Sequence, residues 1–151
     1  MSYLRAKDAV GGAMGTCFAI IDGERYELMQ VKEVTATVKK TKTELSILGL
    51  TAKQVKSGGW SGTGKMKAYY VSSLFREMML KYMKNGEDLF FELLITNEDP
   101  DSEAGRQSVL LKGVNLDEMV LAALDVDSSA LEEEMTFTFE DAELMESFAA
   151  L

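Results

Sequence analysis

The stretch that decides the fold is Val34-Thr35-Ala36-Thr37-Val38-Lys39, where apolar and polar residues alternate. A period of two predicts a β-strand with one apolar and one polar face. The strand-like segment around it runs from Arg25 to about Lys40, and its sixteen residues would span about 53 Å at ~3.3 Å each. Strands usually have about 3–10 residues, and a compact domain cannot cover both faces of a much longer one. The segment must therefore bend, or part of it must project and pair with another subunit.

Shorter strand-like runs lie on both sides of this segment. Asp22-Gly23 predicts a tight hairpin turn after the first run, because both turn positions need a positive φ. Residues 43–49 are a candidate hairpin partner of the long segment, across Lys40–Lys42. The shorter predicted strands are 16–21, 43–49, 65–71, 88–96, 106–116, 119–126 and 135–140.

One clear helix is predicted over residues 73–85. Ser72 or Ser73 can cap its N-terminus, and Gly86 suits a left-handed C-cap. Its apolar stripe predicts a face that packs on the core. The stripe consists of Leu74, Phe75, Met78, Met79, Tyr82 and Met83.

Three other segments complete the predicted architecture. Residues 1–15 are small and Gly-rich and predict an N-terminal arm, residues 50–64 predict a polar, Gly-rich loop, and residues 142–151 predict a short helix. With about eight strands and one long helix, the 151 residues are predicted to form a single domain. The predicted fold class is mainly β, a β-sandwich or barrel with one flanking α-helix.

The residue content argues against several function classes. The chain has 25 acidic and 16 basic residues, a formal charge of −9. Nucleic-acid binding needs clustered Lys and Arg, so specific binding is not expected. The chain contains no histidine, and Cys17 alone can form no internal disulfide, so we expect no catalytic residue, metal or cofactor. No signal peptide or membrane helix is predicted, which favours a reducing cytoplasm.

One motif comes close to a phosphate-binding loop. Gly59–Lys65 fits the first seven positions of G-x-x-x-x-G-K-[ST], but Met66 has no hydroxyl for Mg²⁺. A polar stretch precedes the motif and a period-two strand follows it, so a nucleotide-dependent enzyme is the weakest hypothesis. A contact loop fits better. In it, Trp60 either packs back on its own domain or anchors a neighbouring subunit.

Three stretches have a distinctive order and spacing: Leu124–Asp141, Val34–Glu44 running into Ile47–Gly49, and Gly62–Met66 with Tyr70–Phe75. Together they resemble the tail tube protein family of the PBSX-type contractile phages and of R-type, diffocin-like bacteriocins. The similarity covers about residues 16–148, and its C-terminal stretch is the most specific part.

The resemblance implies a structural subunit of a hollow tube of stacked hexameric rings. One sheet from each of six subunits would join its neighbours in a barrel around the lumen. The implied partners are further copies of the chain, a tail sheath protein, and baseplate and tail terminator proteins. The implied particle is assembled in the bacterial cytoplasm. In a phage, DNA would pass through the lumen without specific binding, whereas a bacteriocin tube carries no genome.

Two sets of residues are candidates for roles in such an assembly. Thr35, Thr37 and Lys39 are lumen-facing candidates because they form the polar face of the long strand. The lysines fit a purely acidic lumen poorly, so ring-to-ring contacts are the alternative for them. A different function, a small-ligand-binding β-barrel protein, stays open at this point. The inter-subunit contact candidates are Gly58, Gly59, Trp60, Ser61, Gly62, Lys40 and Lys42.

Overall fold

The computed structural model describes residues 15–28, 31–49, 51–70, 73–98, 105–127 and 131–146, so most of the predicted N-terminal arm lies outside the described residues. The predicted fold class, mainly β with one flanking helix, is confirmed. The helix is α1, Leu74–Asn85. The strands are β1 Gly15–Ile21, β2 Glu24–Glu27, β3 Val31–Leu45, β4 Gln54–Tyr69, β5 Phe91–Glu98, β6 Arg106–Glu118, β7 Glu132–Phe139 and β8 Asp141–Glu146.

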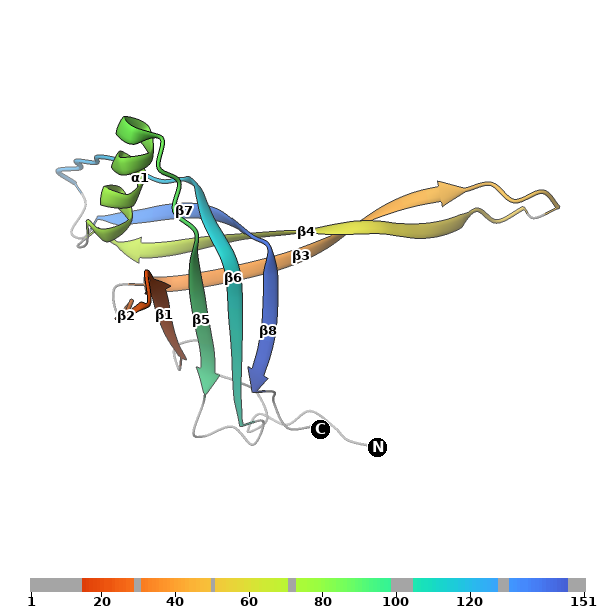
Figure 1. Ribbon diagram of the computed structural model, residues 1–151, viewed down its shortest axis with the longest axis horizontal. Coiled ribbons are helices and arrows are strands. Elements are labelled where there is room, and N and C mark those ends of the chain that lie inside the picture. Colours follow the sequence, from red (N-terminus) through yellow and green to blue (C-terminus); the bar gives the residue numbers. More distant parts are fainter. Residues whose placement is uncertain are drawn as a thin grey trace.

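The strands form one antiparallel sheet that is bent into two layers. Their order is β2-β1-β5-β6-β7-β4-β3, and β8 also pairs with β6. In Figure 1, β1, β5, β6 and β8 form one layer, and β7, β4 and β3 cross it as the second. β6 belongs to both layers, because residues 106–114 pair with β5 and residues 115–118 pair with β7.

The bend between the layers has a local cause. Gly113 in β6 has a φ of 64°, which favours glycine. Beside it, Glu140 separates β7 from β8, and its backbone N–H donates to the carbonyl of Lys112 at 2.9 Å. A Cβ on Gly113 would lie 2.8 Å from the Glu140 carboxylate. Both chain segments therefore change layer at one place, where only a glycine fits.

The core lies between the two layers and under α1. Phe75 and Met78 are the buried residues of the helix, and the Phe75 ring lies 5.7 Å from that of Phe91. Each large side chain buried in this way contributes roughly 1.5–3 kcal/mol of transfer free energy. The largest fully buried side chains come from both layers: Phe137, Met66, Leu93, Leu111, Met135 and Val114.

Two local predictions are confirmed. Asp22 and Gly23, with φ values of 52° and 80°, join β1 to β2, and Ile21 pairs with Glu24 across the turn. The helix ends at Gly86, whose φ is 71° and whose N–H donates to the Tyr82 carbonyl at 2.9 Å. The predicted apolar stripe is buried only in part, because Tyr82 and Met83 are exposed.

The predicted loop at residues 50–64 is wrong, because residues 54–64 belong to β4. Glycines lower the strand propensity of a segment, since they have no side chain to pack. Here aromatic rings of β7 cover two of the four glycines, Gly62 and Gly64. A Cβ on Gly62 would lie 2.5 Å from the Phe139 ring, and Gly64 packs in the same way against Phe137. The covering rings are far away in the sequence, so local propensity could not reveal this strand.

Other boundaries also differ from the prediction. The segment 25–40 divides into β2 and β3, and β3 continues through residues 43–45 and pairs with β4, so 43–49 is not its hairpin partner. The buried Leu28, whose N–H donates to the Cys17 carbonyl at 2.8 Å, lies between the two strands. Residues 119–126 form no strand, and residues 142–146 belong to β8 instead of a helix.

The long hairpin of β3 and β4 projects far beyond both layers (Figure 1). We call residues 38–49 and 51–61 the hairpin arm. Apart from the turn near its tip, its two strands pair only with each other, whereas residues 62–69 of β4 also pair with β7. The expectation that part of the long strand projects is thereby confirmed.

Candidate assembly surfaces

The second layer presents a face made of polar residues. Residues paired across antiparallel strands have their side chains on the same face. The register places Glu33, Lys67 and Glu134 in one row across β3, β4 and β7. The next rows are Thr35, Lys65 and Thr136, then Thr37, Thr63 and Thr138, and finally Lys39 and Ser61. We call these rows the polar face.

The opposite face of the same strands packs on the core. Met66, Met135 and Phe137 alternate with the residues of the polar face and are at most 1% exposed. None of the rows of the polar face contains an apolar residue. Since nothing apolar on this face needs a cover, the face is suited to permanent contact with water.

The structure brings the predicted lumen candidates together. Thr35, Thr37 and Lys39 lie on the polar face, as the alternation in β3 predicted. Thr63, Lys65, Thr136 and Thr138 were not predicted as site residues, although the alternation of Met135, Phe137 and Phe139 with threonines carried the signal. Only the register between β4 and β7 joins the two threonine sets.

An ion pair closes one end of the polar face. Nζ of Lys32 donates to Glu132 at 2.7 Å and lies 5.6 Å from the centre of the Tyr69 ring. The hydrogen bond to Glu132, with its charge, raises the pKa of Lys32. The lysine therefore stays protonated at every physiological pH and balances the glutamate.

A buried ion pair attaches α1 to the other side of β7. Arg76 donates to the carboxylate of Glu133, and the two side chains are 12% and 4% exposed. The guanidinium also stacks over the Tyr70 ring at 4.2 Å and donates to the Val120 carbonyl at 3.4 Å. These contacts fix the helix on the second layer, away from the polar face.

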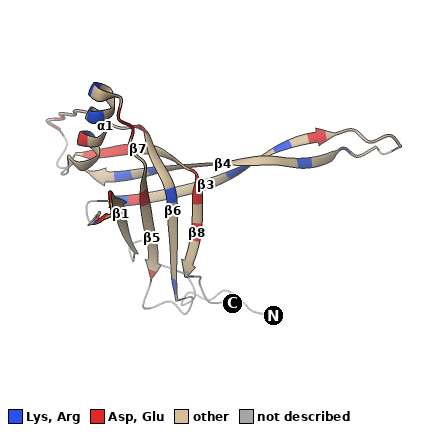
Figure 2. Ribbon diagram, in the orientation of Figure 1, with Lys and Arg blue, Asp and Glu red and all other residues tan. Residues whose placement is uncertain are grey.

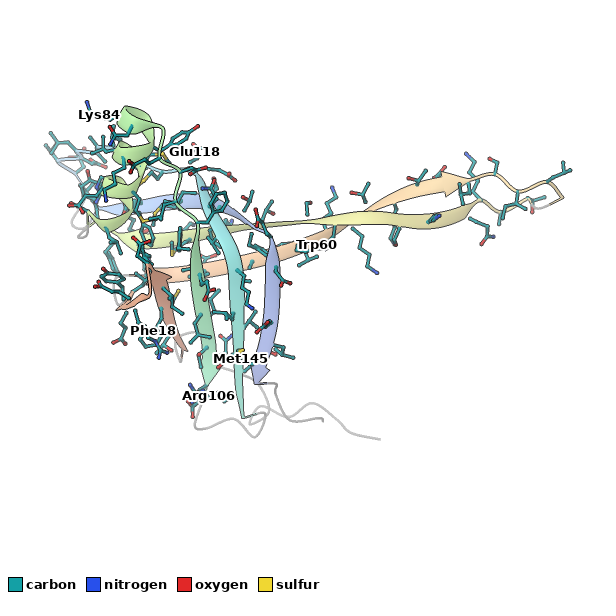
Figure 3. All side chains as sticks on the ribbon, viewed as in Figure 1. Phe18, Trp60, Lys84, Arg106, Glu118 and Met145 are labelled. Atoms are coloured by element: carbon teal, nitrogen blue, oxygen red, sulfur yellow. The ribbon has the colours of Figure 1, made fainter. Side chains whose placement is uncertain are left out.

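Trp60 lies in the hairpin arm, close to where the arm leaves the body of the subunit, and pairs with Lys40 (Figure 3). Its ring lies 6.1 Å from that of Phe139, yet the residue remains 48% exposed. It contributes to an open, mainly apolar cavity of about 450 Å³. Trp60 thus packs on its own subunit and still leaves about half of its surface exposed. The cavity is lined by Val38, Lys40, Ser57, Gly59, Trp60, Phe139, Asp141 and Ala142.

The other contact candidates occupy different environments. Gly58, Gly59 and Ser61 are exposed in β4, as are Lys40 and Lys42 in β3. Gly62 is buried under the Phe139 ring and cannot offer a contact surface. The apolar cavity beside Trp60 includes Phe139 and Ala142, which the sequence did not indicate as contact residues because they come from β7 and β8.

Charge is unevenly distributed over the molecule. The segment 31–69, which forms the long hairpin, has eight lysines and two glutamates, although the whole chain is acidic. Figure 2 shows basic residues along β3 and β4, with a few acidic ones on β3, and acidic residues on β5, β7 and β8; basic residues also occur in α1 and β6. The strongly acidic surface therefore lies on the body of the subunit and not on the hairpin.

Neither a membrane helix nor a metal cluster is found in the described ranges. No helix there is long and apolar enough to cross a membrane. No group of three or more His, Cys, Asp or Glu residues is placed to hold a metal ion. Cys17 is buried, and this burial raises the pKa of its thiol to about 12.

A two-layer β subunit with one polar, solvent-exposed sheet face and a projecting hairpin is typical of structural proteins that self-assemble. The model of the phage tail tube protein family matches residues 2–146. The phage-like element PBSX protein XkdM of Bacillus subtilis (strain 168) is 40% identical over 146 residues, which cover 97% of each chain. The chain belongs to the phage tail tube protein family.

Solved structures show the same fold at low sequence identity. The chain is similar to one in the anti-feeding prophage tube-terminating cap, with a TM-score of 0.71, 8% identity and 97% of both chains covered. It is also similar to one in the sheath-tube complex of the extracellular contractile injection system PVC, with a TM-score of 0.69, 10% identity and 93% coverage of both. The chain is a structural component of a phage tail or tail-like particle and not an enzyme.

Proposed function

We propose that this tail tube subunit assembles into stacked hexameric rings, in which β3 joins the sheet of the next subunit. β3 is the last strand in the sheet order, so within the described residues one edge has no partner strand. An unpaired edge of this length invites association, and closure into a ring removes it. A related particle, the anti-feeding prophage, has a baseplate solved with six-fold symmetry.

In this assembly the polar face of β3, β4 and β7 lines the lumen. The single observation that carries this assignment is that its rows contain only Thr, Ser, Lys and Glu. The helix α1 lies on the opposite side of the second layer, attached through Arg76 and Glu133 on β7. The inner surface of a tube stays in contact with water, so it needs polar side chains like those of this face.

The hairpin arm and the cavity beside Trp60 make the contacts between subunits. Val38 and Trp60 are 58% and 48% exposed, far more than core residues of the same strands. Lys40 and Lys42 add positive charge that fits the acidic body of a second copy. Gly58, Gly59 and Ser61 allow close approach of that copy.

The further partners are a sheath around the tube, a baseplate and a tail terminator. This proposal is supported by the similarity to chains of a sheath-tube complex and of a sheath/tube terminator structure. Assembly takes place in the bacterial cytoplasm. In a phage particle, DNA passes through the lumen without specific binding.

Electron microscopy of the native particle tests the proposal. The chain is expected in a hollow tube with six-fold rings, and the polar face of β3 and β4 is expected on the inner surface. A tube of different symmetry would contradict the hexamer. An inner surface formed by β1 and β5 would contradict the assignment of the lumen face.

A further inference from the structure

The charges on the polar face are balanced, although the chain as a whole is strongly acidic. Lys67 lies between Glu33 and Glu134 in one row, and Glu118 pairs with Thr136 at the edge of the next. At the end of the face, Lys32 and Glu132 form their 2.7 Å ion pair. The four rows hold three lysines, Lys39, Lys65 and Lys67, and two glutamates, Glu33 and Glu134. The bordering residues Lys32, Glu118 and Glu132 bring the totals to four lysines and four glutamates.

Balanced, interleaved charges produce almost no field at a distance. The potential of a lysine beside two glutamates largely cancels beyond a Debye length, which is about 8 Å at physiological ionic strength. A net acidic wall would repel a polyanion, and a net basic wall would bind it by releasing counterions. The described part of this face would do neither.

The uncharged residues of the face also lack features that retain cargo. Five threonines occupy its centre, Thr35, Thr37, Thr63, Thr136 and Thr138, and their hydroxyls bind water. Single-stranded nucleic acids are held by aromatic side chains on which bases stack. None of the four rows contains such a side chain. Tyr69, which pairs with Glu132 beyond them, is 41% exposed, and Nζ of Lys32 lies 5.6 Å from the centre of its ring.

We propose that the polar face forms a charge-balanced, threonine-lined passage that conducts charged cargo of either sign without electrostatic selection. This inference rests on the proposed function, since it applies only if the polar face lines the lumen. It concerns the chemical class of the cargo: a polyanion such as DNA and a cationic solute should meet the same wall.

Thiol labelling of assembled tubes tests the proposal. Thr63→Cys places one thiol at the centre of the face, and Thr37→Cys offers a second position in the same row. The native Cys17 gives little background, because it is 7% exposed and the reactive thiolate is suppressed by a pKa of about 12. The probes are a cationic and an anionic methanethiosulfonate of similar size, each applied to tubes and to a short unfolded peptide with one cysteine.

The ratio of the two reaction rates reports the potential at the wall. For a balanced wall the ratio in tubes stays within about twofold of the ratio in the peptide. A tenfold or larger preference for either reagent would overturn the proposal. Lys65→Gln and Glu134→Gln, each in the Thr63→Cys background, are matched controls that should shift the ratio in opposite directions.

Failure of the proposed function has a separate signature. A maleimide attached to a polymer too large for the lumen should react with the Thr63→Cys thiol in monomers but not along intact tubes. If tubes react as fast as monomers, the polar face is on the outside, and the lumen assignment fails whatever the charge ratio is.

Discussion

The long hairpin has two parts, which are built from the same two strands: the root, residues 31–37 and 62–69, and the hairpin arm. They differ in what covers them. At the root, Met66 and Ala68 of β4 are buried, because β7 pairs with this part and the first layer lies over it. In the hairpin arm, Val38 and Val55 are 58% and 56% exposed. The same ladder of backbone hydrogen bonds thus supports a core in one place and an uncovered ribbon in the other. An isolated two-stranded ribbon is marginally stable in water, so the arm needs a partner.

The largest expected effect is at the root. Phe137→Ala removes a fully buried ring that packs on Gly64, and should lower the free energy of unfolding by about 3–5 kcal/mol. Chemical denaturation of the monomer measures this loss. The neighbouring Thr138→Ala, on the polar face, should stay within about 0.5 kcal/mol of the parent protein. Equal losses of unfolding free energy in both variants would contradict the division of β7 into a face that packs on the core and a face exposed to solvent.

The second effect concerns the attachment of the helix. Arg76→Leu leaves the carboxylate of Glu133 buried without its partner and should lower the free energy of unfolding by about 2–4 kcal/mol. This loss is somewhat smaller than for a fully buried pair, because the Arg76 side chain is 12% exposed. The double variant Arg76→Leu with Glu133→Leu removes both charges and should recover most of this loss. Denaturation curves that show no recovery would contradict the ion pair as the cause.

The arm should behave in the opposite way to the root. Trp60→Ala removes a half-exposed ring and should lower monomer stability by only about 1 kcal/mol, yet block tube formation. Sedimentation and electron microscopy measure assembly, and Trp60→Phe should retain part of it. Tubes of normal length with Trp60→Ala would refute the contact role. Deleting residues 58–62 would be a poorer test, because Gly62 belongs to the buried part of β4.

The smallest effect at neutral pH is expected at Cys17, which is buried in β1. Because burial raises the folded-state pKa of the thiol from its ordinary value of 9.0 to about 12, the stability that depends on the neutral thiol is fully present below pH 9. It is lost as the pH rises from 9 to 12. Cys17→Ala should flatten this part of the stability profile. An unchanged slope in that variant would assign the alkaline loss to other groups.

The alternation in Val34–Lys39 and in Met135–Glu140 was sufficient to predict two strands and their polar faces. The Asp22-Gly23 turn and the helix that ends before Gly86 were also predictable, because their signals involve neighbours in the chain. The family could be recognised for the same reason, since similarity is read residue by residue.

The part of β4 before residue 65 could not be predicted, since Phe137 and Phe139, which cover Gly62 and Gly64, lie about 70 residues away in the sequence. The same holds for β8, which pairs with β6 only after the bend at Gly113 and Glu140. The sequence of 142–146 by itself has an apolar spacing that also fits a helix.

The amino-acid sequence by itself determined that the chain is a mainly β, acidic protein without histidine and that one strand is too long for a compact domain, because composition and period are local properties. Only the tertiary structure decided which polar residues share one face. Alternation gives each strand two faces, but it does not say which strands are neighbours or in which register. The pairing of β3 with β4 and of β4 with β7 turned separate threonines, lysines and glutamates into one balanced surface.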